Sequence, residues 1–306
     1  MHKLKSNLYK NFGGANVSII FLIAAVLVWQ LPPNNPSNIF IKNFIFTIEI
    51  VFIVALYIWH QTINVESRAL YQFHARNKVD TIDKIILVLF AYVVERNFSP
   101  AFNFGDNPQN EERIIKEMSH QSVWEGLYKT GIKAPIIEEI VFRGLLYSAI
   151  VLAILYIAKA NVEDHSRRLI ATCIFFLVSS FIFGYLHISS YGDYENIGVY
   201  ILPGIIFSTV FILTKNIMYS IMVHMLGNIV GTLNTYHYKL HEIALPIGEY
   251  LNNILAFLLL ILFIERLVCG FNYVMRHKEE IKQLNDMELL RWIFHKLKLR
   301  YLYFEN

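Results

Sequence analysis

Long apolar runs constrain the fold of this chain more than any other feature of its sequence. Of its 306 residues, 55% are hydrophobic and only 17% are charged, whereas a soluble domain carries roughly 25% charged residues. The apolar residues gather in stretches of about 20 residues, the length that a helix needs to cross a bilayer. The sequence therefore predicts an all-α fold, a polytopic membrane helix bundle with about eight transmembrane spans.

The expected spans are separated by polar loops, and their edges are defined only to within a few residues. They cover residues 16–31, 41–60, 82–100, 130–157, 169–188, 198–214, 217–235 and 246–266. The second and third spans are less apolar than the others, so we expect them to need partner helices or anchoring at the membrane interface. Their charged residues are Lys42 and Glu49 near the second span, and Asp83, Lys84, Glu95 and Arg96 near the third.

Basic residues in short loops predict the orientation of a membrane protein, because such loops stay in the cytoplasm. Lysine and arginine mark the N-terminus and the loops 61–84 and 158–168, whereas the loop 189–197 has none. We therefore expect a multi-pass cell-membrane protein with both termini cytoplasmic. The loop 101–129 is an exception to the pattern, because it carries Arg113, Lys116 and Lys129 on the nominal outer side. The first apolar run lacks a small-x-small cleavage site and is interpreted as a retained signal anchor.

The tail after the last span is polar and then amphipathic over residues 287–304. A helix of this kind can lie on an anionic membrane surface or pack against the cytoplasmic end of the bundle. The chain shows no zinc-finger spacing, no glycine-rich phosphate loop and no isolated basic domain, so no nucleic-acid partner is expected. Its two cysteines, Cys173 and Cys269, do not form a disulfide framework.

Three polar signatures interrupt the apolar segments. Charged and amide groups are costly in hydrocarbon, so they usually face a bundle interior, pair with one another and mark a functional site. Residues four apart share one face of a helix, whereas neighbouring residues differ by about 100° in direction. One glutamate of the first signature can thus face a reaction centre while the other pairs with the arginine. The signatures are Glu138-Glu139-x-x-x-Arg143, Phe183-x-x-x-His187 and His224-x-x-x-Asn228.

These groups together have the chemistry to hydrolyse an amide without a nucleophilic side chain. A buried carboxylate can serve as the general base for water. An imidazole and the amide of Asn228 can donate hydrogen bonds to a developing oxyanion. The same groups could equally supply a zinc site, with His187 and His224 as ligands together with Glu138. Zinc is therefore the one possible cofactor that the sequence indicates. The sequence does not decide between a zinc site and catalysis without a metal.

Each signature alone also has a structural interpretation. The first can be an ion pair, the second a packed core histidine, and the third a hydrogen bond between helices. Their occurrence in order on three apolar segments favours a shared functional site. A proton-coupled transporter using Glu138, Glu139 and His187 is a further alternative. It would predict two related halves with interrupted spans, which the sequence does not show.

The three motifs, with the stretch from Pro203-Gly204 to Thr214-Lys215-Asn216, resemble the CPBP intramembrane proteases. That family includes the type II CAAX prenyl endopeptidases and the bacterial Abi proteins. The resemblance covers roughly residues 120–240 and divides the chain into three parts. These are the N-terminal spans and loop (1–119), the protease core (120–240), and the last span with its tail (241–306).

The resemblance implies a metallo- or glutamate-type endopeptidase that cleaves a membrane-associated peptide or protein. It implies that Glu138 and His187 activate water and that His224 and Asn228 form the oxyanion hole. Glu139 and Arg143 then have supporting roles. The implied partners are a peptide or membrane-protein substrate and the lipid bilayer. In bacteria the family is associated with peptide maturation and bacteriocin self-immunity. A non-catalytic immunity protein or membrane chaperone on the same fold is therefore the alternative.

Overall fold

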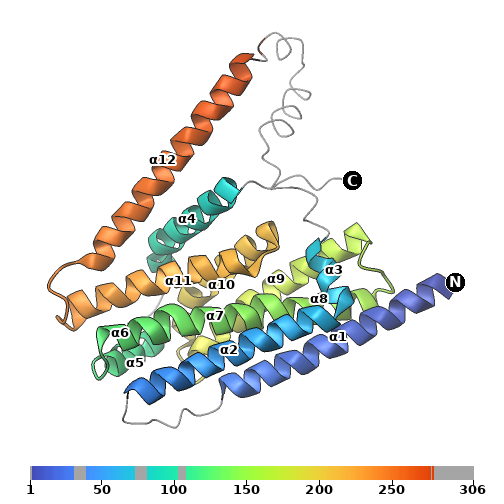
Figure 1. Ribbon diagram of the computed structural model, residues 1–306, viewed down its shortest axis with the longest axis horizontal. Helices are drawn as coiled ribbons and strands as arrows, with labels where there is room; N and C mark the ends of the chain where they lie inside the picture. The colour runs from blue at the N-terminus through green and yellow to red at the C-terminus, as the bar shows by residue number, and fades with distance from the viewer. Residues whose placement is uncertain (1, 31–38, 73–80, 103–107, 277, 279–306) are drawn as a thin grey trace.

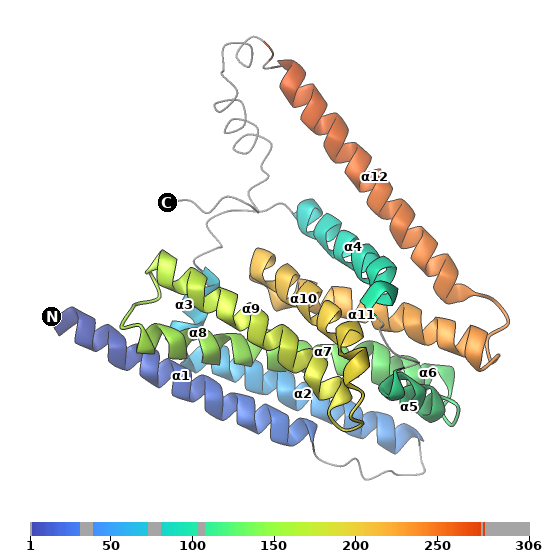
Figure 2. The same cartoon turned by 180° about the vertical axis from the view of Figure 1, so that it is seen from behind.

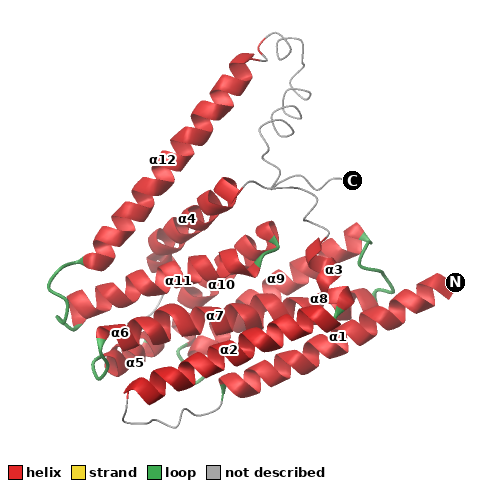
Figure 3. Cartoon of the chain, viewed as in Figure 1, coloured by secondary structure: helices red, strands yellow, loops and turns green. Residues whose placement is uncertain are grey.

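The computed structural model describes residues 2–30, 39–72, 81–102, 108–276 and 278. These residues form helices joined by loops, without any strand (Figure 3). The all-α prediction is therefore confirmed. The amphipathic helix expected over residues 287–304 lies outside the described residues.

Seven helical segments of the described chain are long and apolar enough to cross a bilayer. They are Lys10–Trp29, Phe40–Ile63, Thr81–Phe102, Val123–Ile157, His165–Ile188, Tyr194–Thr214 and Ile247–Asn272. The remaining expected span is also a helix, α11 (Ile217–Asn234), whose polar residues include His224 and Asn228. The prediction of about eight spans thus agrees with the structure, which has these seven candidate spans and the helix α11.

The elements follow one another along the chain with short connections. They are α1 (His2–Trp29), α2 (Ile39–Ile63), α3 (Val65–Gln72), α4 (Thr81–Phe98), η1 (Ser99–Phe102), α5 (Gln109–Met118), α6 (Val123–Gly126), η2 (Leu127–Lys133), α7 (Ala134–Glu139), η3 (Ile140–Leu145), α8 (Leu146–Ile157), α9 (His165–Ile188), η4 (Tyr194–Asn196), α10 (Ile197–Thr214), α11 (Ile217–Asn234), η5 (Thr235–Lys239) and α12 (Ile247–Arg276).

The fourth span begins at Val123 rather than at residue 130, and it includes two π-helical stretches, η2 and η3. Ser122 caps its first turn, since the Ser122 side chain accepts a hydrogen bond from the Glu125 amide at 3.3 Å. The first turns of this span carry charged side chains, so they do not belong to an apolar run of the sequence. The last helix also continues beyond residue 266, to Arg276.

Charged side chains of the second and third spans pair across helices, as their composition predicts. On α2, Lys42 forms an ion pair with Glu125, and Glu49 lies 2.7 Å from the ammonium of Lys133. On α4, Asp83 lies 2.9 Å from the guanidinium of Arg266 on α12. A charge in an apolar bundle needs such a partner. These pairs fix α2 against the fourth span and α4 against α12.

A second polar network joins the first three helices and α8. Asn64 donates to the backbone carbonyl of Gly14 at 2.8 Å, and the Ser18 hydroxyl lies 2.9 Å from the His60 ring. Ser67 on α3 and Ser148 on α8 share a hydrogen bond of 2.7 Å. Because these groups satisfy one another, they hold the N-terminal helices to the central span inside an apolar environment.

The helices pack into one bundle with α12 at its edge. In Figure 1, α1, α2, α7 and α8 run side by side, and Figure 2 shows α9 and α10 on the opposite face. α12 lies along α4, where the Tyr92 hydroxyl donates to the side-chain oxygen of Asn252 at 2.8 Å. The most apolar stretch of α12 has no buried residue. Large apolar side chains such as Phe257 and Phe263 therefore remain exposed, as suits contact with lipid tails.

A tight turn positions α11 against α10. Lys215 adopts the left-handed conformation at φ 49°, and its ammonium donates to the buried Tyr147 hydroxyl at 2.9 Å. Asn216 then caps α11 by accepting a hydrogen bond from the Met218 amide at 3.0 Å. This connection brings His224 of α11 opposite Phe207 of α10.

Candidate active site

A cavity of about 610 Å³ opens between α4, α5, the fourth span, α9, α10 and α11. Four of the six predicted site residues line it, namely Glu138, His187, His224 and Asn228. The other two, Glu139 and Arg143, are fully buried behind its wall. Three separate motifs of the sequence are thus brought to a single hollow inside the bundle.

The two adjacent glutamates have different surroundings. Glu138 lies on the cavity wall, where its Oε2 is buried and accepts no hydrogen bond within the described part of the chain. Both carboxylate oxygens of Glu139 accept hydrogen bonds, Oε1 from Arg143 at 3.0 Å and Oε2 from the Ser220 hydroxyl. A carboxylate that lacks a partner can take a proton from water, whereas one with several donors has a structural role.

Arg143 ties the first motif to α10. Its Nη2 donates to the carbonyl of Gly204 at 2.9 Å and lies 3.4 Å from the Ser208 hydroxyl. The guanidinium also lies 4.9 Å from the ring of Phe183 and 5.5 Å from that of Phe207. The buried cation is therefore neutralised by Glu139 and surrounded by aromatic faces, which suit a guanidinium.

Phe183 holds His187 in a defined orientation. Nδ1 of His187 lies 2.7 Å from the Phe183 carbonyl, and because a carbonyl only accepts, this nitrogen carries the proton. In the neutral ring, Nε2 is then the acceptor. The ring stacks on Tyr200 with centroids 4.9 Å apart. His187 thus lines the cavity with an imidazole whose tautomer is set by its own helix.

His224 is held by Glu139 and by an aromatic surface. Its Nδ1 lies 3.1 Å from Glu139 Oε1, and its ring stacks on Phe207 with centroids 4.4 Å apart. Its Nε2 is 3.9 Å from Glu138 Oε2. Because Nδ1 is engaged by a carboxylate, Nε2 is the nitrogen available to a ligand in the cavity.

A proline in the fourth span explains how Asn228 is oriented. In the π-helical stretch η2 the Ala134 amide bonds to the Lys129 carbonyl, so the next bond of this ladder would come from Pro135. Proline has no N–H, and the Thr130 carbonyl is left without that donor. Nδ2 of Asn228 fills the gap at 2.8 Å. An amide nitrogen carries two protons, so the second remains available to the cavity.

The residues as placed do not fit a zinc site. Both histidines engage Nδ1 with a protein acceptor, which is also usual around zinc. A metal centre needs a third ligand, however, and no group of three or more His, Cys, Asp or Glu side chains in the described ranges could hold a metal ion.

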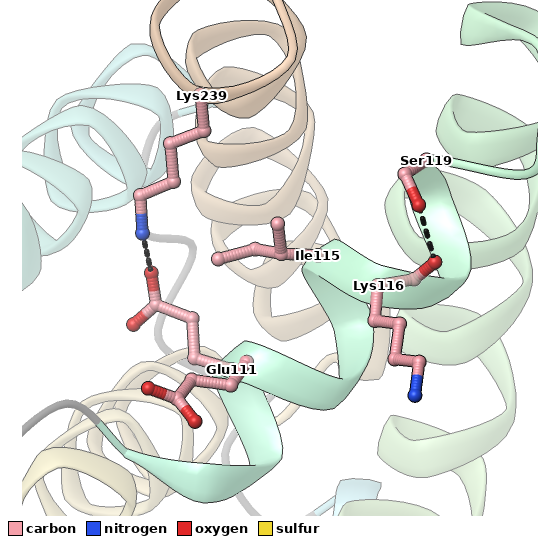
Figure 4. Close-up of a pocket in the computed structure, with 6 residues that line it drawn as sticks. Glu111, Ile115, Lys116, Ser119 and Lys239 are labelled. Atoms are coloured by element: carbon pink, nitrogen blue, oxygen red, sulfur yellow. Dashed lines mark hydrogen bonds and ion pairs between the residues drawn. The ribbon is translucent and has the colours of Figure 1, made fainter.

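A second pocket, of about 390 Å³, lies between α5 and η5 (Figure 4). Figure 4 shows Lys239 reaching Glu111, with 3.0 Å between the charged groups, and Ser119 donating to the Lys116 carbonyl at 2.8 Å. None of the six predicted site residues lines this pocket. Its charged groups are paired or exposed, so it lacks the buried reactive groups of the larger cavity.

The motif search missed several residues that shape the site. Ser220 and Thr130 contact site residues directly, but small hydroxyl residues carry no signal of their own in an apolar helix. Glu95 of α4 also lines the cavity. A signal for it was present, because a carboxylate within an apolar span is itself a candidate for function.

Part of the chain matches a known protein family. Residues 121–230 match the family model for the type II CAAX prenyl endopeptidase Rce1-like proteins, and this stretch contains all six predicted site residues. Residues 121–230 are therefore called the Rce1-like domain, after the family that they match. The match confirms the resemblance to type II CAAX prenyl endopeptidases. α1 to α5 and α12 lie outside the matched stretch.

Part of the chain is also similar to a curated bacterial protein. A stretch of 102 residues is 34% identical to the membrane-embedded CAAX protease MroQ of Staphylococcus aureus (strain USA300). That stretch covers 33% of this chain and 36% of MroQ, about a third of the length of each. No solved structure gives a significant match.

Proposed function

We propose that this chain is an intramembrane endopeptidase that hydrolyses a peptide bond in a membrane-associated peptide or protein. The observation that carries the proposal is the presence of two reactive groups in one cavity. Glu138 offers an unpartnered carboxylate oxygen, and His187 offers the ring nitrogen opposite its Phe183 contact. The Rce1-like domain and the seven apolar helices support an enzyme of this class in a membrane.

In the proposed reaction, Glu138 and His187 hold a water molecule beside the scissile carbonyl. Glu138 takes a proton from the water while the water oxygen bonds to the carbonyl carbon. The peptide C–N bond then breaks, the proton passes to the leaving amine, and the water oxygen remains in the new carboxyl group. No covalent enzyme intermediate is needed.

His224 and Asn228 stabilise the tetrahedral intermediate in this proposal. In its imidazolium form, His224 donates through Nδ1 to Glu139 and through Nε2 to the oxyanion. Asn228 donates to the oxyanion the side-chain amide proton that is not bonded to the Thr130 carbonyl. Donors held in place before the reaction are worth about 3 kcal/mol each in related oxyanion holes. Glu139 and Arg143 act by holding His224 and the helix in position.

The partners proposed for this chain are the lipid bilayer and a peptide or membrane-protein substrate. The distribution of basic loops supports a cytoplasmic location of both termini. We further propose that residues 120–240 form the protease core, with residues 1–119 and 241–306 as flanking parts. A non-catalytic immunity protein or chaperone on the same fold is the outcome that an inactive purified protein would favour.

The proposal is tested with purified protein in proteoliposomes and a pool of synthetic transmembrane and juxtamembrane peptides. Mass spectrometry should detect new peptide termini with the unaltered protein but not with Glu138→Gln. The substitution Glu163→Gln removes a carboxylate from an exposed loop and serves as the matched control. Exhaustive chelation should leave cleavage intact. Stoichiometric zinc whose removal stops cleavage, and whose return restores it, would instead establish a metalloprotease.

A further inference from the structure

α4 places a carboxylate in the cavity that the proposed reaction does not use. Glu95 lies outside the Rce1-like domain, so the family comparison assigns it no role. Its Oε2 is buried and has no hydrogen-bond partner among the described residues. Other charged residues of the second and third spans, such as Glu49 and Asp83, have found cationic partners on neighbouring helices. Glu95 therefore stands out as a carboxylate whose buried oxygen has no hydrogen-bond partner among the described residues.

Glu95 lies against the part of α11 that carries the proposed oxyanion donors. A methyl group built on Gly227 would lie 2.9 Å from Glu95 Oε2 and 3.2 Å from Oε1. Gly227 directly precedes Asn228 and follows His224 by three residues. The absence of a side chain at Gly227 thus makes room for the carboxylate at a point on α11 that is less than one helical turn, about 5.4 Å, from both oxyanion donors.

The basic residues around the cavity do not supply the missing partner. Those on its edge already form ion pairs with other carboxylates, apart from Arg96, which is exposed and forms no ion pair with Glu95 in the described structure. The pairs are Lys129 and Arg113 with Glu117, and Lys133 with Glu49. The cavity consequently presents two carboxylates, Glu95 and Glu138, each with a buried oxygen that accepts no hydrogen bond among the described residues. Of these two oxygens, that of Glu138 lies 3.9 Å from Nε2 of His224. Such a surface is complementary to a cation.

We propose that Glu95 is a substrate-binding subsite for a basic side chain, lysine or arginine, of the cleaved peptide. This inference rests on the proposed protease function. An extended peptide advances about 3.3 Å per residue. A subsite within one helical turn of the oxyanion donors therefore holds a residue within about one to three positions of the scissile bond. The substrate cation pairs with a carboxylate whose buried oxygen has no other hydrogen-bond partner in the described ranges, so the contact adds both affinity and specificity.

The test uses internally quenched apolar peptides that differ at one position. Lysine, glutamine or glutamate is placed at each of three positions on either side of the cleaved bond. At one position the lysine peptide should be cleaved about tenfold better than the glutamine peptide, and the glutamate peptide worst. Glu95→Gln should bring the lysine-to-glutamine ratio close to one, and Glu95→Lys should invert the preference towards glutamate.

Two further variants separate the subsite from general damage. Gly227→Ala keeps the charge but pushes the carboxylate aside, so it should lower the ratio as well. Glu163→Gln, on an exposed loop, should leave the ratio unchanged. Anisotropy of fluorescent peptides bound to the Glu138→Gln protein, with and without Glu95→Gln, measures the same preference without cleavage.

The outcomes distinguish the subsite from the protease function. Cleavage without any preference for lysine would overturn the subsite and leave the protease function standing. A lysine preference in binding that Glu95→Gln abolishes, with no cleavage of any peptide, would support the subsite and overturn the protease function. An equal lysine preference in the Glu95→Gln and unaltered proteins would also overturn the subsite.

Discussion

At the scale of single residues, the buried pair of Glu139 and Arg143 decides how the site is held. Both side chains are fully buried, and Glu139 accepts from His224 and Ser220 as well as from the guanidinium. Charges of this kind add little net stability as a pair, but the loss of one partner leaves the other uncompensated. The pair therefore specifies the position of His224 more than it stabilises the fold.

We expect Glu139→Gln to lower the free energy of unfolding by about 3 kcal/mol, because Arg143 is left as an unpaired buried cation. Cleavage should slow but persist, since Glu138 is unchanged. Adding Arg143→Gln should cost less than the sum of the two single losses, by about 1–3 kcal/mol. Thermal unfolding of the purified single and double variants measures this coupling. Additive losses would show that the two residues do not act as a unit.

At the scale of elements, the π-helical stretch η2 links a local backbone defect to the chemistry. Pro135 withholds the N–H that the Thr130 carbonyl would otherwise receive, and Asn228 takes its place. The fourth span thus orients a residue of α11 by means of a missing hydrogen bond.

The substitution Pro135→Ala tests this link. Its new N–H competes with Asn228 for the Thr130 carbonyl, so the turnover rate should fall several-fold while KM changes little. Thermal stability should stay equal or rise, because the backbone gains a hydrogen bond. Steady-state kinetics alongside thermal unfolding distinguishes this from damage to the fold. An unchanged turnover rate would show that Asn228 does not depend on the proline.

The helix α5 forms the polar edge of the cavity. Glu117 accepts from Arg113 and from Lys129 of the fourth span, and the Gln109 amide donates to Asp193 at 2.9 Å. Burial opposes ionisation of Glu117, but Lys129 and Arg113 outweigh it and hold its pKa below the ordinary value of 4.5. A carboxylate with a lowered pKa stabilises the folded contact above its ordinary pKa, and that stabilisation is lost as the pH falls through the folded value.

We therefore expect the contact of α5 with the fourth span to be unchanged between pH 7 and pH 5 and to weaken below about pH 4.5. Hydrogen exchange of α5, corrected for the intrinsic effect of pH, measures this directly. The matched variant Glu117→Gln should show weaker protection already at pH 7 and a flatter response to acid. Equal protection of α5 at pH 7 and pH 3.5 would contradict the assigned role of this carboxylate.

The same scale shows which features can be predicted from sequence. Apolar runs predict the helices well, because burial in lipid depends on local composition. They misplace the start of the fourth span, since Glu125 and Lys133 look polar until their partners on α2 are known. The grouping of polar residues into one cavity follows from their cost in hydrocarbon. The sequence does not predict that Glu95 Oε2 lacks a hydrogen-bond partner among the described residues, because this depends on which neighbours the bundle supplies.

At the scale of the whole molecule, the bundle combines a compact centre with an exposed edge. The Rce1-like domain supplies every motif residue, and α4, from outside it, completes the cavity with Glu95. α12 has little buried surface and leans on α4 through Arg266 and Asn252. A bundle arranged in this way buries its polar site in protein and leaves apolar faces for lipid.

The central claim is that the cavity hydrolyses peptide bonds through Glu138. The most direct measurement compares the N-termini of all membrane-associated proteins and peptides in cells that lack this chain and in cells that carry it. Cells with the unaltered or the Glu163→Gln protein should contain new N-termini that are absent with Glu138→Gln at equal membrane levels. The same new N-termini in cells carrying Glu138→Gln would contradict the account, as would the absence of any new N-terminus with the unaltered protein.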